Sequence, residues 1–192
     1  MTMLTDLRKR EAKRLSIQPW IIFSEPALQD MATYYPLTIE DMTSISGVNE
    51  GKARKYGKSF LQLIKEYVED NDIERPSDFV MKQVANKSKN KVGIIQGIDR
   101  KLPMEDIAQR AGMNYESFLE ELNTIVDSGT KLDIGYYLDE EMDEGVVEEI
   151  FDYFHEAESP DVEEAVKELA EDDIDREEIQ LVRIKFISEV VN

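Results

Sequence analysis

Residues 36–60 read PLTIEDMTSISGVNEGKARKYGKSF, and this stretch decides the fold of the first part of the chain. Thr38 and Asp41 have the spacing of a helix cap, and residues 47–51 contain Gly and Asn, which tolerate a sharp turn. A basic helix starts directly afterwards, at Lys52. The first backbone N–H groups of a helix have no partner within it and favour anions. The stretch therefore predicts two helices joined by a turn that suits nucleic-acid phosphates.

The same turn has a superficial similarity to a P-loop, G-x-x-x-x-G-K-[ST]. It has one residue too few between Gly47 and Gly51, and Ala53 stands where a hydroxyl would hold magnesium. The residues before it begin a helix, whereas a P-loop follows a strand. We therefore expect no nucleoside triphosphate site at this turn.

The composition is that of a globular helical protein. Of 192 residues, 41% are hydrophobic and 34% are charged, which is too apolar for a disordered chain. The chain contains no cysteine, which excludes disulfides, a thiol nucleophile and cysteine-bound zinc. No apolar run approaches the about 18 residues that span a membrane, and no signal-peptide core follows the charged N-terminus. We expect a cytoplasmic protein with no membrane partner.

Charge is divided unevenly along the chain, whose net charge is −19. Residues 1–100 carry 16 Lys and Arg against 14 Asp and Glu, and residues 101–192 carry 7 against 28. The second part therefore has a net charge of −21. This division predicts two regions with different electrostatic roles, of which the acidic one repels nucleic acid unless it is turned away from it.

Helical periodicity runs through almost the whole chain, and no segment alternates as a strand does. The predicted fold is all-α, with a compact helical domain at residues 1–75, a linker at 76–90 and an acidic helical domain at 91–192. The linker is placed by polar tracts around residues 69–77 and 86–91. Helices are expected at residues 4–15, 25–35, 39–45, 51–68, 94–98, 104–111, 115–127, 146–154, 161–169 and 175–190. We expect caps at Ser24, Thr38, Asn114 and Ser159, and Tyr67 on the inner face of the helix at residues 51–68.

Residues 104–127 have the spacing of a helix-turn-helix, with Gly112 at the turn. Ala108 and Gly112 are small where two crossing helices come close. A recognition helix presents Arg, Lys, Asn or Gln to phosphates and bases. The second helix here is expected to expose three carboxylates and one amide: Glu116, Glu120, Glu121 and Asn123. We favour a structural role for the motif over specific DNA reading, which stays the weaker alternative.

No set of residues is suited to catalysis. His155 is the only histidine and lies among aromatic residues, as packing or surface histidines do. The carboxylate runs at residues 139–144 and 172–175 lack the order of a calcium loop and are typical of solvated helix faces. We expect no catalytic residue, no metal site, no cofactor and no enzymatic activity in this chain.

Two basic clusters are the best candidates for a binding surface. One lies at residues 8–14 and the other at residues 52–58, directly after the turn. The alternative is that both are ordinary solvated helix faces, but the turn adds backbone donors to the second cluster and favours a phosphate contact. Three aromatic residues are expected in the core rather than as platforms for bases: Trp20, Tyr34 and Tyr35. The predicted DNA-binding residues are Gly47, Asn49, Gly51, Lys52, Arg54, Lys55, Lys58, Arg8, Lys9 and Lys13.

Short motifs follow one another in the first part of the chain: Leu7-Arg8-Lys9, Trp20-Ile21-Ile22-Phe23-Ser24, Leu28, Met31-Ala32, Pro36-Leu37-Thr38, Ile45-Ser46-Gly47-Val48 and Lys55-Tyr56-Gly57. In order, spacing and residue type they resemble the HRDC domain, a module found near the C-terminus of RecQ-family helicases and in RNase D. The resemblance covers residues 4 to about 70. It implies that the first domain is an HRDC-like helical bundle.

The second half carries further motifs: Lys91-Val92-Gly93-Ile94-Ile95, Asp106-Ile107-Ala108 and Ser128-Gly129-Thr130-Lys131-Leu132-Asp133-Ile134. They resemble the helix-turn-helix tail that follows the HRDC domain in some bacterial RecQ proteins. The whole chain is therefore similar to the C-terminal region of a bacterial RecQ-type ATP-dependent DNA helicase, separated from its motor.

The resemblance implies a parent that unwinds DNA in the 3'-5' direction during repair and recombination, with ATP bound in motor domains that this chain lacks. It also implies that the HRDC-like part binds single-stranded or forked DNA weakly, at the bacterial nucleoid, and adjusts substrate choice. The chain departs from the related pattern at Asn49, where a second glycine is common and where the Asn side chain would crowd a phosphate. Two alternatives remain: an acidic module that docks on the helicase core or another protein, and a folded spacer.

Overall fold

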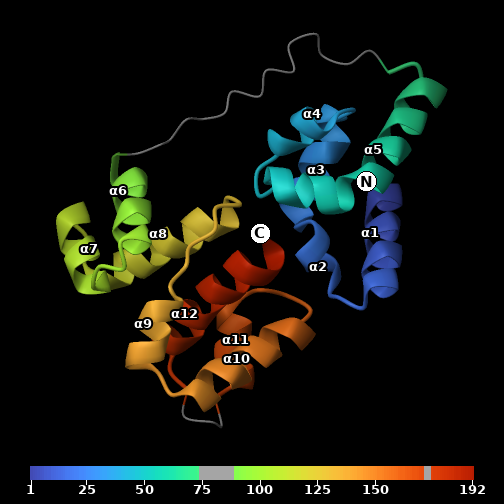
Figure 1. Ribbon diagram of the computed structural model, residues 1–192. Coiled ribbons are helices and arrows are strands. Elements are labelled where there is room, and N and C mark those ends of the chain that lie inside the picture. Colours follow the sequence, from blue (N-terminus) through green and yellow to red (C-terminus); the bar gives the residue numbers. More distant parts are fainter. Residues whose placement is uncertain (74–88, 171–173) are drawn as a thin grey trace. The chain divides into compact units, whose positions relative to one another are not determined.

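The computed structural model describes residues 1–73, 89–170 and 174–192, and in these ranges it contains helices and no strand. The predicted all-α class is therefore confirmed. The described residues fall into two compact units, one with α1 to α5 and one with α6 to α12. Figure 1 shows these helices in the colours of the sequence. The linker expected at residues 76–90 lies almost wholly outside the described residues, so the domain boundaries stay a prediction.

The first unit is built from five helices: α1 (Thr2–Leu15), α2 (Pro19–Ile22), α3 (Glu25–Tyr34), α4 (Ile39–Thr43) and α5 (Glu50–Asp70). Two of the predicted caps are confirmed. The Ser24 hydroxyl accepts a hydrogen bond from the Ala27 N–H at the start of α3. Thr38 and Asp41 form a reciprocal capping box at the start of α4, which satisfies two backbone donors that the helix itself leaves unpaired. The single helical turn of α2 was not predicted.

The core of the first unit is closed by aromatic contacts and by one close helix approach. The rings of Phe23 and Phe60 meet edge to face, 4.9 Å apart, and both side chains are fully buried. Helices α4 and α5 pack closely, because Gly57 leaves room for Met42: a Cβ at Gly57 would lie 2.6 Å from the Met42 sulfur. Tyr67, expected on the buried face of α5, is 40% exposed.

Among its described residues the second unit contains seven helices: α6 (Lys89–Asp99), α7 (Met104–Ala111), α8 (Tyr115–Asp127), α9 (Gly135–Glu141), α10 (Glu144–Glu156), α11 (Val162–Glu168) and α12 (Arg176–Phe186). A π-helical turn, Ile187–Val191, follows α12, and the unit ends within it at Val190. Helix α9 was not predicted, because it starts with a glycine and has no side-chain cap. Helix α11 begins one residue later than expected, where Asp161 and not Ser159 accepts the capping hydrogen bond.

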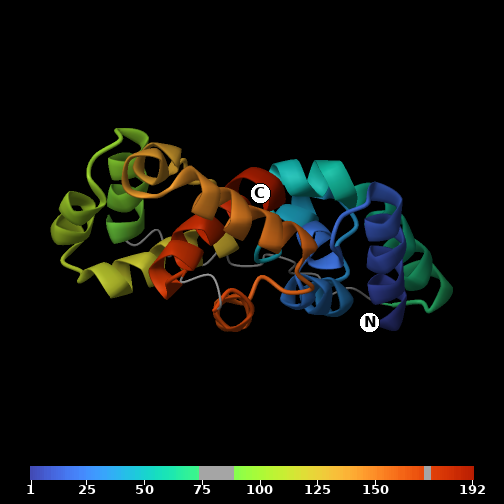
Figure 2. The same cartoon turned by 90° about the horizontal axis from the view of Figure 1, so that it is seen from below.

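Helix α12 is the centre of the second unit. It packs against α8, α10 and α11, as Figures 1 and 2 show, and its Ile179, Val182 and Phe186 are fully buried. Buried Arg183 joins three segments: its guanidinium donates to the Pro160 carbonyl at 2.7 Å, to Asn123 Oδ1 at 2.6 Å and to Asp127 Oδ1 at 2.9 Å. Every nitrogen of this guanidinium has an acceptor, which makes burial of the charge tolerable.

The predicted helix-turn-helix is present, but Gly112 serves its backbone conformation and not, as expected, a close helix crossing. Ala108 is buried between helices, in line with a tight crossing. Gly112 is not crowded, since a Cβ there would meet nothing within 4 Å. Its φ of 71° is the left-handed conformation that ends α7, which favours glycine. Asn114 then caps α8, its Oδ1 accepting the Ser117 N–H at 2.8 Å.

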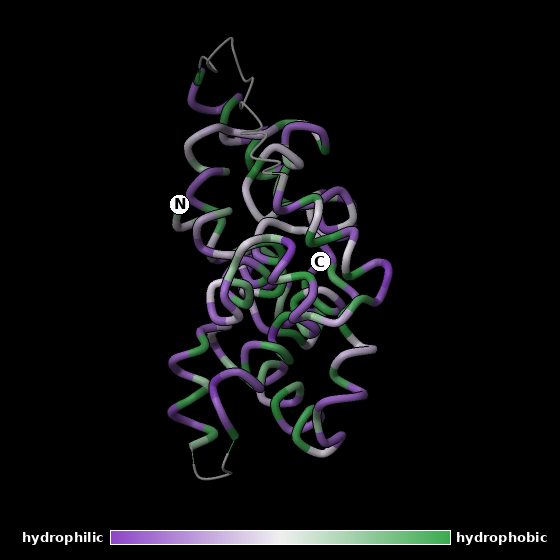
Figure 3. Tube along the Cα trace, turned by 90° about the vertical axis from the view of Figure 1, so that its left-hand side faces the viewer, coloured by the Kyte–Doolittle hydropathy of each residue, from purple (hydrophilic) through white to green (hydrophobic). Residues whose placement is uncertain are grey.

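Hydrophobic and hydrophilic residues alternate along the helices, as Figure 3 shows. This amphipathic pattern lets each helix bury one face in a core and leave the other in water. Among the described residues, no helix combines the length and the hydropathy needed to cross a membrane.

Candidate nucleic-acid interface

The turn before α5 differs from the predicted phosphate cradle. Of its residues only Gly47, with a φ of 75°, is left-handed, while Asn49 is extended. Asn49 is the N-cap of α5, and its Oδ1 accepts the Lys52 N–H at 2.7 Å. This backbone donor is therefore used within the protein and is not offered to a phosphate. Gly51 lies in the first turn of the helix and is exposed.

Lys52, also predicted to bind DNA, is buried. Only 4% of it is exposed, whereas Arg54, Lys55 and Lys58 lie on the outer side of α5. Helical spacing alone does not account for this difference, because Lys52 and Arg54 lie on opposite sides of the buried face that Ala53 and Phe60 mark. Because it is buried, Lys52 is not part of the exposed basic surface.

The exposed cations of α5 form only weak, solvent-exposed contacts within the protein. Arg54 pairs with Glu50 at 2.6 Å, but both side chains are about two-thirds exposed, so water and salt weaken the pair. The Lys55 ammonium lies 4.9 Å from the centre of the Tyr56 ring. Residues 51–65 contain five Lys and Arg and no Asp or Glu. This part of α5 therefore presents Arg54, Lys55 and Lys58 as a basic surface, which we call the α5 surface.

Arg8, predicted from the first basic cluster, is a structural residue. It is 9% exposed, and its two terminal nitrogens donate to the Phe23 carbonyl and to Glu25 Oε2, each at 2.8 Å. It thereby ties α1 to the connection between α2 and α3. Lys9 and Lys13 are exposed, and their spacing of four residues puts them on one side of α1.

The aromatic residues and the single histidine offer no open platform. Tyr35 is stacked on Tyr67, with ring centres 6.2 Å apart. Trp20 and Tyr34 are half-buried. His155 packs edge to face against Phe186 at 4.9 Å, and no group of side chains among the described residues is arranged to hold a metal ion.

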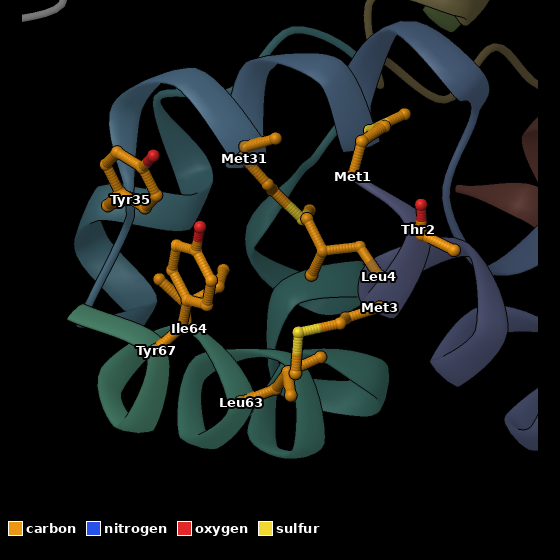
Figure 4. Close-up of a pocket in the computed structure, with 10 residues that line it drawn as sticks. Met1, Thr2, Met3, Leu4, Met31, Tyr35, Leu63, Ile64 and Tyr67 are labelled. Carbon is orange, nitrogen blue, oxygen red and sulfur yellow. The ribbon is translucent and has the colours of Figure 1, made fainter. Parts of the chain in front are cut away.

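Beside the Tyr35–Tyr67 stack, the first unit has an apolar pocket of about 240 Å³ between α1, α3 and α5. Figure 4 shows Met1, Met3 and Met31 with the two tyrosine rings around it. Its lining contains no Lys, Arg, Asn or Gln. Because phosphates are held by such donors, this pocket does not extend the basic surface.

In the second unit, α8 presents carboxylates where a recognition helix would present donors. Glu116 and Glu120 are exposed and Glu121 is half-buried. Asn123, expected to be exposed, is half-buried: its Oδ1 accepts from Arg183 and its amide donates to the Leu119 carbonyl. These carboxylates would repel phosphates, which disfavours α8 as a DNA-reading helix. The sequence-based prediction named no site residue on α6 or α7, although Arg100, directly after α6, and Arg110 of α7 are exposed.

Comparison with known families gives two adjacent matches. Residues 1–64 match the family model of the HRDC domain, and residues 88–138 match that of the RecQ-1-like helix-turn-helix domain. These matches follow the order of the two units described above.

Several curated helicases are similar to parts of the chain. The ATP-dependent DNA helicase RecQ of Haemophilus influenzae is 39% identical over 61 residues, which is 32% of this chain and 10% of that protein. RecQ of Bacillus subtilis is 36% identical over 66 residues, covering 34% and 11%. The bifunctional 3'-5' exonuclease/ATP-dependent helicase WRN of mouse is 28% identical over 117 residues, covering 61% and 8%. The chain thus matches only about a tenth of the length of these relatives.

Proposed function

Because the chain carries an HRDC domain followed by a RecQ-1-like helix-turn-helix domain, and is related to the C-terminal region of RecQ helicases, we propose that it is an accessory region of such a helicase. In this proposal it binds DNA weakly and adjusts which substrates the motor domains unwind in repair and recombination. It performs no catalysis of its own and works at the bacterial nucleoid. The resemblance inferred from the sequence agrees with the family matches.

The α5 surface is the observation that carries this proposal. Arg54, Lys55 and Lys58 lie within 15 residues that contain no carboxylate. Lys9 and Lys13 on α1 are further exposed cations of the same unit. Phosphate contacts of this kind give affinity without sequence preference, which suits a domain that meets single-stranded or forked DNA of any sequence.

The affinity is expected to be low and sensitive to salt. The capping role of Asn49 removes one backbone donor, so side-chain cations supply most of the binding. Three or four such contacts with a single strand give a slope of about −2 to −3 in a plot of log affinity against log salt. This dependence distinguishes phosphate binding from stacking of bases.

The test is fluorescence anisotropy with labelled single-stranded and forked oligonucleotides. We expect Arg54→Ala/Lys55→Ala/Lys58→Ala to bind at least several-fold more weakly and to reduce the salt slope by about 2. Lys131→Ala/Lys167→Ala is the matched control, because it removes two exposed cations that lie elsewhere. Equal binding by the triple variant and the wild type would refute the proposal.

A second candidate function is favoured by the acidity of residues 112–192, which contain 26 Asp and Glu against 5 Lys and Arg. Such a surface suits docking on a basic face of the motor domains or of another protein. The chain would be added in trans to a RecQ motor core that lacks it, and ATPase and unwinding rates measured. Replacement of exposed Glu140, Glu141, Glu148 and Glu149 by Gln should remove any effect. An effect that survives this neutralisation would count against docking by charge.

A further inference from the structure

Helices α6 and α7 enclose a pocket of about 250 Å³ that lies outside the α5 surface. Figure 1 shows the two helices side by side in the second unit. Three residues of α6 and the residue that follows it line this pocket and are three or four positions apart in the sequence: Asn90, Gly93, Gly97 and Arg100. This spacing puts them in one stripe along the helix. Arg110 of α7 lines the same pocket.

The two glycines in this stripe differ in what surrounds them. Gly97 packs against α7, since a Cβ there would lie 2.8 Å from Ile107 Cγ1. A Cβ at Gly93 would meet nothing within 4 Å. Glycine within a helix lowers stability by about 0.5–1 kcal/mol relative to alanine. At Gly93 no packing contact offsets this loss, and the missing side chain leaves the helix backbone open to the pocket.

The two arginines of the pocket are exposed and form no ion pair with the described residues. This is notable in a unit rich in carboxylates: Asp106, four residues before Arg110, has the spacing of a helical ion pair but does not form one. Residues 89–111 carry five Lys and Arg against three Asp and Glu. The pocket is therefore a locally positive site within an acidic unit.

The arginines lie towards opposite ends of the pocket. The Asn90 side-chain amide donates to the Ala111 carbonyl at 3.4 Å, which places the start of α6 beside the end of α7, and thus near Arg110. Arg100 follows the other end of α6. The ten residues from Asn90 to Arg100 span about 15 Å of helix. Two cations at this separation suit phosphates of one strand that lie a few nucleotides apart.

We propose that the α6–α7 pocket binds the sugar–phosphate backbone of a nucleic-acid strand, with Arg100 and Arg110 as the phosphate ligands and Gly93 as its open floor. The guanidinium forks match phosphate oxygens in geometry and charge. The absence of a side chain at Gly93 permits the strand to approach the helix backbone. The helix-turn-helix domain then meets nucleic acid through α6 and α7 rather than through the carboxylate-bearing α8.

The test is anisotropy of a labelled oligothymidylate with the full chain at low salt. Arg100→Ala/Arg110→Ala is expected to weaken binding about three- to tenfold and to reduce the salt slope by about 1.4. Gly93→Glu puts a carboxylate into open space within the pocket and should weaken binding at least as much. The control Lys131→Ala/Lys167→Ala should bind as the wild type does. Thermal melting of each variant shows whether it is folded.

The same measurements are repeated with Arg54, Lys55 and Lys58 replaced by Ala, which separates this site from the α5 surface. If replacing the pocket residues does not weaken oligonucleotide binding, either in the wild type or in the triple α5 variant, the inference is overturned. This holds whatever effect the α5 substitutions have. A poly-glutamate peptide is the competing ligand. If it binds with the same dependence on Arg100 and Arg110 while the oligonucleotide does not, the pocket is a carboxylate site and the proposal of a nucleic-acid ligand is wrong.

Discussion

Arg8 and Lys9 are neighbours in the sequence, but Arg8 is buried and Lys9 is exposed. Arg8 enters the core of the first unit and supplies donors to Phe23 and Glu25, whereas Lys9 remains in water. Sequence reasoning grouped both in one basic cluster, because charge alone does not show which face of a helix is covered. Replacing each of the two residues by Ala distinguishes a cation that stabilises the fold from one that is free to bind a ligand.

We expect Arg8→Ala to lower the free energy of unfolding of the first unit by about 2 kcal/mol, because the buried Phe23 carbonyl loses its donor. In a unit of this size the melting temperature falls by about 8–16 °C. Lys9→Ala should change stability by less than about 0.5 kcal/mol. Circular dichroism during heating measures both. A similar melting temperature for the two variants would contradict the structural role of Arg8.

The glycines of α6 make a second prediction for single residues. Gly97→Ala should destabilise the second unit by about 1–3 kcal/mol, because its Cβ collides with Ile107. Gly93→Ala should stabilise it by about 0.5–1 kcal/mol, since it has open space and reduces the entropy of the unfolded chain. Urea unfolding gives both values. Destabilisation by Gly93→Ala would show that this position is packed.

At the scale of elements, a polar network joins the ends of several helices of the second unit. The hydroxyls of Tyr115 on α8 and Tyr137 on α9 lie 2.9 Å apart. Glu177, at the start of α12, interacts with both. It is exposed but partly desolvated, and this desolvation together with the charge of Asp175 raises the pKa of its carboxyl. Burial also raises the pKa of the Tyr115 hydroxyl. The carboxylate of Glu177 is thus less favoured in the folded protein than in the unfolded chain.

This shift predicts a pH-dependent effect of Glu177→Gln. Because the folded state holds the proton to higher pH, the stability contributed by Glu177 is full below its unfolded pKa and falls as pH rises through the raised pKa. The variant should therefore melt higher than the wild type at pH 7, by only about 1–2 °C because solvent screens the site, and equally at about pH 3. Melting curves across this range measure the difference.

The neighbouring residue provides the control. Glu178 Oε2 accepts the Asp175 N–H at 2.9 Å as part of the capping box of α12. Glu178→Gln therefore weakens the capping box, which Glu177→Gln leaves intact, and should not stabilise the protein. A higher melting temperature at pH 7 for Glu178→Gln than for Glu177→Gln would contradict our assignment.

At the scale of the whole molecule, the charge division does not coincide with the two units. Residues 89–111, which include α6 and α7, are slightly positive, and the excess of carboxylates begins with α8. The sequence-based division at residue 100 therefore cut through the second unit. The second unit thus has a positive first part, which suits DNA contact, and an acidic remainder, which suits protein docking. Both proposed functions are compatible with it.

This distribution predicts that the two units respond differently to salt. Raising NaCl from about 0.02 to 0.5 M screens repulsion among the carboxylates, so the melting temperature of the second unit should rise. The first unit, with nearly balanced charge, should change little. Calorimetry measures both transitions, and Arg8→Ala identifies the first unit by lowering only its transition. A second-unit transition that falls with salt would contradict this account.

The sequence by itself determined the helical class, most helix limits, the caps at Ser24, Thr38 and Asn114, and the likeness to RecQ helicases. Periodicity and capping are local properties, readable within a few residues. Helices α2 and α9 were missed because a single helical turn and an uncapped, glycine-led helix carry little local signal.

Only the tertiary structure decided which basic side chains are exposed and can contact a ligand. It buried Arg8, Lys52 and Arg183. It also brought Arg100 and Arg110 to one pocket. These outcomes depend on which face of each helix is covered by residues distant in the chain, because burial and pairing are properties of the packed molecule and not of its local pattern.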